Sequence, residues 1–152
     1  MTQLLLESIA VALNKTFDDG YTVYQENVEQ GLREPCFFVQ CLETNRTLFR
    51  GVRYFRTHTI SIQYFPASRE KPKAECEVVA QQLFDALERL PLRDGQATLR
   101  GKEARYRIID GVLYFFVEYD CFEKKKVEID KMRTLTISVE GERNGTRKNN
   151  RT

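Results

Sequence analysis

The sequence predicts an α+β domain in which two main helices pack on a largely antiparallel sheet of about four to six strands. Two segments carry apolar residues at helical spacing, and several others alternate apolar and polar residues as strands do. These segments follow the order helix, strands, helix, strands. With 152 residues, 41% of them hydrophobic and 30% charged, the chain is long enough for one core. We expect a single domain over residues 1–140 and a flexible basic tail over residues 141–152.

The first segment, "MTQLLLESIAVALNKTF", has the pattern of an amphipathic helix, because apolar residues recur at every fourth position. These residues are Leu5, Ile9, Leu13 and Phe17. We expect Gly20, in the following "DDGY", to supply the left-handed conformation that helix ends favour. A short strand, "YTVYQENV", and a loop or turn, "EQGLREP", come next.

Two long strands are expected after this loop. "CFFVQCLETNRTLFRG" is rich in aromatic and β-branched residues, "YFRTHTISIQYFP" alternates, and the loop around Gly51 would pair them as antiparallel neighbours. Pro66 cannot donate to a strand ladder, so the second strand is expected to end there. The polar segment "ASREKPK" leads into a second helix, whose apolar face runs from Val79 to Leu90 and which we expect Pro91 to end.

A hairpin completes the predicted core. "ARYRII" and "VLYFFVEYDCF" flank Asp110 and Gly111, a strong signal for a two-residue hairpin turn. In the second strand one face is apolar, formed by Leu113, Phe115, Val117, Tyr119 and Cys121. Glu118 and Asp120 lie on the other face, which we expect to be at least partly wet. "TLTISVE" predicts one more strand, and "GERNGTRKNNRT" has no large apolar residue to anchor it.

The charge and the N-terminal segment exclude some classes of function. The formal net charge of +2 is far from the basic excess of a dedicated nucleic-acid binder. The apolar run near the N-terminus is too short to span a bilayer and Glu7 interrupts it, so we expect no membrane association. In the cytosol, where we expect the protein to be made, the four cysteines are expected to be reduced thiols; they are Cys36, Cys41, Cys76 and Cys121.

We find no pattern of residues that predicts a catalytic, cofactor-binding or metal site. The one histidine, His58, lies on the aromatic-rich side of its strand, where a packed and hydrogen-bonded side chain is more common than a general base. The strand-to-helix corner "ISIQYFPASREKPKAE" has no glycine with which to form a phosphate-binding nest. We expect Ser68 there to be a helix N-cap or a turn residue, and the cations of this corner to be solvated.

Two alternatives involve charged side chains. Four of them match the D…ExK pattern of metal-dependent nucleases, in which carboxylates hold a divalent ion and a lysine steadies the attacking water; they are Asp110, Asp120, Glu123 and Lys125. Asp110 has a second explanation as a turn residue. The tail contains Arg143, Arg147, Lys148 and Arg151, which would be either a solvated end or a site for nucleic acid or an acidic protein.

The order of elements resembles a known family. "LLLESIAVALNKTF" leads to "YTVYQENVEQGLREPCFFVQ", "ISIQYFP", a helix ending in "LFDALERL" and the hairpin "YRIIDGVLYFFVEYDCF". Over about residues 1–125 this arrangement resembles the tail terminator, or tail completion, proteins of long-tailed bacteriophages, notably of prophages in Gram-positive bacteria, and the caps of phage-tail-like bacteriocins. The resemblance implies a structural, non-enzymatic protein without a cofactor.

The resemblance also implies partners and a location. The protein would form a hexameric ring on the head-proximal end of the tail tube, stop tube polymerisation and offer a docking surface to a neck or connector protein. In a contractile tail it would meet the sheath protein, and DNA would pass through the lumen of a DNA-containing particle. It would be found in the host cytoplasm during assembly and then at the tail-neck end of the virion. The alternative in the same class is a head-tail joining or other virion assembly protein.

A closed ring requires two different complementary surfaces on each subunit. The candidate interface residues mix aromatic and charged side chains, and they are Tyr114, Phe116, Glu118, Asp120, Arg69, Lys71 and Lys73. The alternative for Tyr114 and Phe116 is burial beneath a further helix. The loop over residues 26–35 and the tail beyond Glu140 are candidate segments that order on docking.

Overall fold

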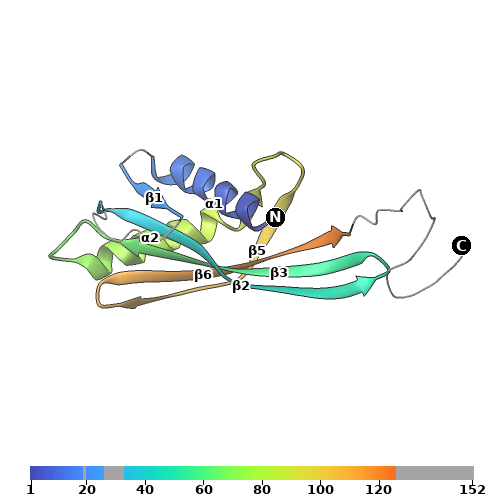
Figure 1. The fold of residues 1–152 in the computed structure, drawn as a ribbon. Coiled ribbons are helices and arrows are strands. Elements are labelled where there is room, and N and C mark those ends of the chain that lie inside the picture. The colour runs from blue at the N-terminus through green and yellow to red at the C-terminus, as the bar shows by residue number, and fades with distance from the viewer. Residues whose placement is uncertain (19, 26–32, 126–152) are drawn as a thin grey trace, which may run out of the picture. The chain divides into compact units, whose positions relative to one another are not determined.

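The structure is a computed structural model, and it describes residues 1–18, 20–25 and 33–125 (Figure 1). Its elements are α1 (Thr2–Phe17), β1 (Thr22–Tyr24), β2 (Cys36–Arg50), β3 (Arg53–Phe65), α2 (Pro72–Ala86), β4 (Arg89–Pro91), β5 (Thr98–Ile109) and β6 (Val112–Lys124). The predicted α+β class is confirmed. The predicted strand "TLTISVE" and the basic tail lie outside the described residues, so the domain boundary at residue 140 stays a prediction.

The six strands form one mixed sheet in the order β1-β2-β3-β6-β5-β4. β1 pairs with β2 in parallel, whereas β5 pairs with β4 and β6 in antiparallel fashion. The two-residue connection between β2 and β3 contains Gly51 at φ 56°, and Asp110 and Gly111, at φ 51° and 77°, form the predicted turn between β5 and β6. Positive φ at both central residues suits the twist of a hairpin.

The chain divides into two compact units. The first, called the core unit here, comprises Met1–Thr44 and Thr57–Asp120, and the second unit comprises Asn45–Arg56 and Cys121–Thr152. Both helices and all of β1, β4 and β5 belong to the core unit. The second unit contains the turn between β2 and β3 and the last residues of β6.

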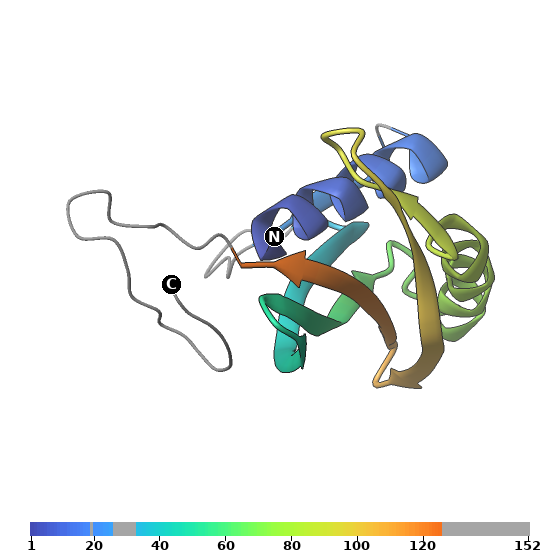
Figure 2. The ribbon, with the colours of Figure 1, turned by 90° about the vertical axis from the view of Figure 1, so that its right-hand side faces the viewer.

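Within the core unit the two helices cover the same face of the sheet (Figure 2). The stripe on α1 is buried as predicted, and alternate residues of the strands are buried beneath the helices. On β3 these are His58, Ile60, Ile62 and Tyr64, and on β6 they are Leu113, Phe115, Val117 and Tyr119. The opposite face of β6 is only half-buried, as the alternation predicted.

Aromatic rings fill the space between the end of α1 and the sheet. The ring of Phe17 lies 4.9 Å from that of Phe37, which lies 4.9 Å from that of Tyr64. Tyr21 joins all three, with centroids 5.4–6.0 Å away. Tilted pairs at these separations are favourable beyond the area that they bury, so this cluster stabilises the junction of α1, β1 and the sheet.

Two details of the helix ends differ from the prediction. Gly20 does not take a positive φ; Asp18 does so at 57°, and its backbone N–H donates to the Asn14 carbonyl. The second helix ends at Ala86 instead of Leu90, and Arg89–Pro91 forms β4. Pro91 therefore ends a short strand, while Leu90 still points into the core.

Gly101 explains why the chain after α2 can pack so closely on β5. A Cβ atom at this position would meet the Leu87 carbonyl oxygen at 2.6 Å and Val117 Cγ2 at 3.0 Å. The same carbonyl accepts a buried hydrogen bond of 2.7 Å from the Tyr119 hydroxyl. The segment that follows α2 is therefore held against β5 and β6 at a distance that only glycine permits.

We expect Gly101→Ala to lower the free energy of unfolding by about 1–3 kcal/mol, because the added methyl group displaces the Leu87 carbonyl and strains its bond to Tyr119. Urea unfolding followed by circular dichroism measures the change. Gly20→Ala is the matched control, since a Cβ atom added there would meet nothing within 4 Å and its φ is not positive. Equal stability of the two variants would contradict the role of this contact.

Candidate interaction surface

The half-buried face of β6 carries four of the predicted interface residues. These are Tyr114, Phe116, Glu118 and Asp120. Arg107 lies opposite Tyr114, Arg105 opposite Phe116, and Lys102 opposite Glu118 on the neighbouring strand β5. Since cross-strand partners share a face, β5 adds three cations to this surface. Tyr114 and Phe116 are half-exposed among the described residues, so no helix described there buries them fully.

Four charges on this face are paired with one another, and the fifth, Arg107, has no ion pair among the described residues. The Asp120 carboxylate accepts a hydrogen bond of 2.7 Å from the Thr57 hydroxyl and forms an ion pair with Lys102. The pKa of Lys102 is raised, chiefly through its bond to Asp120. Arg105 lies 3.8 Å from the Glu118 carboxylate and 5.4 Å from the centre of the Phe116 ring. The hairpin thus presents aromatic rings beside two cations and two carboxylates that already have partners.

The strand-to-helix corner is built around Glu75, in the first turn of α2. Its carboxylate accepts hydrogen bonds of 3.0 Å from the backbone N–H groups of both Ala67 and Ser68. It also accepts a bond of 2.5 Å from the Tyr64 hydroxyl. Ser68 is a turn residue whose hydroxyl accepts from the Lys71 N–H, and Lys71 is the helix N-cap. The corner is therefore held by one carboxylate.

The remaining predicted interface residues lie on this corner. Arg69 and Lys71 in the loop, and Lys73 on the first turn of α2, are exposed. The start of α2 packs against the turn between β5 and β6, because a Cβ atom added at Gly111 would lie 3.4 Å from Pro72. Nothing in the structure joins these three cations to Tyr114 or Phe116 within the described residues, so their common use stays a prediction.

The residues with candidate chemistry are engaged in the fold. His58 is fully buried and its Nδ1 shares a hydrogen bond of 3.2 Å with the Thr44 hydroxyl, as expected for a packed side chain. Burial raises the pKa of the Cys76 thiol to about 11 and, with the charge of Glu34, that of the Cys36 thiol. Such thiols are poor nucleophiles at neutral pH.

Each carboxylate of the nuclease pattern has a different structural role. Asp110 is a turn residue, Asp120 bonds Thr57 and Lys102, and Glu123 accepts from Arg56 at 3.0 Å. Within residues 1–18, 20–25 and 33–125, no group of three or more His, Cys, Asp or Glu residues could hold a metal ion. The structure therefore gives the nuclease hypothesis no support. In the same part of the chain no helix is long and apolar enough to cross a membrane.

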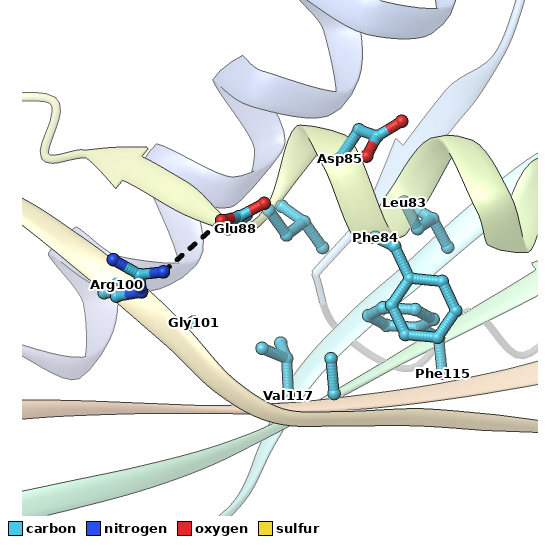
Figure 3. Close-up of a pocket in the computed structure, with 10 residues that line it drawn as sticks. Leu83, Phe84, Asp85, Glu88, Arg100, Gly101, Phe115 and Val117 are labelled. Carbon is cyan, nitrogen blue, oxygen red and sulfur yellow. Dashed lines mark ion pairs between the residues drawn. The ribbon is translucent and has the colours of Figure 1, made fainter.

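A pocket of about 270 Å³ opens between the end of α2 and strands β5 and β6 (Figure 3). Its apolar wall consists of Leu83, Phe84, Leu87, Phe115 and Val117. Gly101 and Ala104 line it from β5, and Asp85, Glu88 and Arg100 provide its charged groups. Glu88 and Arg100 face each other at 3.6 Å. We did not predict this pocket from the sequence, because it depends on where α2 ends.

The second unit carries an exposed aromatic cluster, called the Phe122 cluster here and formed by Phe49, Phe55 and Phe122. The ring of Phe122 lies 5.2 Å from each of the other two, at 67° to both. Phe49 is 58% and Phe122 61% exposed. The sequence signal was the recurrence of phenylalanine beside arginine and lysine in "LFRG", "YFR" and "CFEKKK", which we did not interpret as a surface.

These features define an α+β protein whose small sheet carries half-exposed aromatic and charged side chains. The chain belongs to the phage tail terminator family, since the family's model, described as phage tail terminator protein, matches residues 5–131. It is therefore a structural protein of bacteriophage tail assembly and is associated with the virion. No curated protein matches the chain. One solved structure aligns with 80% of this chain and 96% of its own at 12% identity and a TM-score of 0.40, which carries no argument about function.

We expect Glu75→Gln to lower the free energy of unfolding by about 1–2 kcal/mol at pH 7, because hydrogen bonds to a charged acceptor are stronger than those to an amide. Burial alone would raise the pKa of Glu75, but the bonds from Tyr64, Ala67 and Ser68 outweigh it and lower the pKa below its usual 4.5. The stabilisation is thus complete above that value and is lost as the pH falls through the lowered pKa. Urea unfolding of both proteins at several pH values measures it.

The difference between the wild type and Glu75→Gln should therefore narrow in acid. Glu70→Gln, an exposed carboxylate in the same loop, is the control and should change stability little at any pH. A difference between the wild type and Glu75→Gln that stays constant from pH 7 to well below 4.5 would contradict the assigned role of this carboxylate.

Proposed function

We propose that this protein caps the head-proximal end of a phage or phage-like tail tube as a six-membered ring. In this position it stops the addition of tube subunits and offers a docking surface to the neck or connector protein. The observation that carries the proposal is the match of the tail terminator family over residues 5–131. Terminating a tail requires binding surfaces in the right places, and it needs no chemical step from the protein.

The geometry of the β5–β6 hairpin supports a role for it in the ring. Tyr114 and Phe116 supply half-exposed aromatic area, and four of the five flanking charges have partners within the same face. A neighbour that covers this face therefore leaves few unpaired charges, whose burial is costly. We propose that Tyr114, Phe116, Glu118 and Asp120 form one ring surface and that the cations of the corner, Arg69, Lys71 and Lys73, contribute to a second.

The partners follow from the proposed position. They are further copies of this chain, the tail tube protein, the neck or connector protein and, in a contractile tail, the sheath protein. DNA passes through the ring where the particle carries it. The particle is a virion, a prophage product or a phage-tail-like bacteriocin of Gram-positive bacteria, and assembly takes place in the host cytoplasm.

Deletion of the gene tests the proposal. We expect particles from cells without the gene to have tubes of excessive or irregular length whose upper ends lack a cap and do not join a neck. Electron microscopy of particles from cells with and without the gene measures tube length and the structure of the upper end. Tubes of normal length with a normal cap in the deletion would sink the proposal.

A substitution on the hairpin tests the proposed ring surface. We expect Phe116→Asp to reproduce the long-tube phenotype at least in part, because it places a third acidic group beside Glu118 and Asp120 and removes aromatic contact area. The folded state should persist, since Phe116 is half-exposed. Val78→Asp, which changes a residue 62% exposed on α2, is the control. Normal tails with Phe116→Asp would remove this residue from the interface.

A further inference from the structure

We propose that the pocket at the end of α2 receives the Phe122 cluster from a neighbouring copy of this chain. The inference rests on the ring of the proposed function and goes beyond it, because it adds a further pair of unlike surfaces, the pocket and the Phe122 cluster, to the contact between subunits. Head-to-tail closure of a ring requires such a pair on every copy.

The pocket has the chemistry to hold an aromatic side chain. Phe84 lies edge-on to Phe115, with ring centres 5.1 Å apart, and both line the pocket. Figure 3 shows these rings on one side of the pocket, with Glu88 and Arg100 on the other. A volume of about 270 Å³ accommodates an incoming ring. Pockets of this kind, an apolar wall with a few charged groups, are where aromatic anchors bind at interfaces.

The short pairing of β4 with β5 leaves the pocket accessible to an incoming side chain. β4 pairs with β5 only at residues 98–100, so the rest of β5 has no strand on that side among the described residues. The ladder between β5 and β6 shifts register between Lys102 and Arg105, and Glu103 takes φ 54° within this bulge. The bulge places Ala104, with its short side chain, in the pocket lining.

The Phe122 cluster has the properties of an anchor. Three rings in edge-to-face contact lose little conformational freedom when they are buried, and two of them expose more than half of their area. Leu48, which is 56% exposed, is a further exposed apolar side chain of the second unit. An exposed apolar group of this size in a soluble domain indicates an interaction site.

Charge complementarity selects a second copy as the occupant. In residues 45–56 and 121–125 there are six cations and one carboxylate, Glu123, which is already shared by Arg46 and Arg56 at 3.3 and 3.0 Å. Arg50, Arg53, Lys124 and Lys125 have no carboxylate within 4.0 Å in the part of the chain that the structure describes. Two carboxylates, Asp85 and Glu88, border the pocket, and only Glu88 has an ion-pair partner among the described residues. Docking of the aromatic cluster would bring these opposite charges together.

Photo-crosslinking in assembled particles tests the contact. The full chain, tagged and with benzoylphenylalanine at position 122, is produced together with the untagged wild-type chain, and the particles are purified and irradiated. We expect a crosslinked product that contains one tagged and one untagged chain. Mass spectrometry should place the crosslink in residues 83–88 or 100–104 of the untagged chain.

A variant that fills the pocket gives an independent measurement. We expect Ala104→Trp in the untagged chain to lower the yield of the mixed product by about tenfold, because an anchor cannot enter an occupied pocket. Val78→Trp adds the same side chain at an exposed position that does not line the pocket, and it should change the yield by less than about twofold. Thermal unfolding of both variants verifies that they are folded.

Each other outcome contradicts the docking proposal. A crosslink to the tube protein, to a neck protein or to DNA would assign the Phe122 cluster to that partner, and a crosslink elsewhere on a second copy would move the contact. No crosslink in particles that contain the tagged chain would also overturn it. The deletion experiment tests the proposed function separately. Long tubes without the gene together with a misplaced crosslink would contradict only the docking proposal. Normal tubes without the gene together with the expected crosslink would contradict only the proposed role in tail termination.

Discussion

The Leu87 carbonyl is the point on which the arrangement of the core unit depends. It accepts the buried hydrogen bond from Tyr119 and lies close against Gly101, so the chain that leaves α2 is held against β5 and β6. From there the Gly101 N–H donates to the Glu88 carbonyl at 2.8 Å, and β4 begins one residue later. The close approach fixes the end of the helix and the edge of the sheet, and it forms one wall of the pocket. A larger side chain at position 101 would move the end of α2 away from β5 and β6 and so disturb the edge of the sheet and the wall of the pocket.

Most of the fold was predictable because its strands and first helix bury one face each. Burial of alternate residues on β3 and β6 and of every fourth residue on α1 leaves a periodic record in the sequence. No such periodic pattern marks the end of α2. Leu87 and Leu90 are buried whether the chain continues as a helix or turns into β4, so their apolar character is the same in both cases. The parallel pairing of β1 was equally hidden, since three residues of strand do not specify a partner.

Some of the candidate surfaces could be predicted from a local sequence pattern, and others could not. The half-exposed face of β6 followed from the alternation of Tyr114 and Phe116 with buried residues, and the turn at Asp110 and Gly111 followed from local sequence. The pocket and the Phe122 cluster depend on contacts between segments that are distant in the chain. Phe49 and Phe122 are more than seventy positions apart, and only strand pairing brings their rings within 5.2 Å. A single sequence without a known pairing does not reveal such neighbours.

The pairing of charges within each surface bears on the contacts that we propose for the ring. On the hairpin, Asp120 is bonded to Thr57 and Lys102 before any neighbour arrives, so covering it requires little further compensation. In the second unit Glu123 is likewise held by two arginines, whereas Arg50, Arg53, Lys124 and Lys125 are exposed and have no carboxylate within 4.0 Å among the described residues. Exposed cations lower the local affinity between like surfaces and favour a surface that carries carboxylates. A subunit with one cationic aromatic surface and one carboxylate-bordered pocket therefore disfavours symmetric pairs and favours head-to-tail contacts, the type of contact from which rings are built.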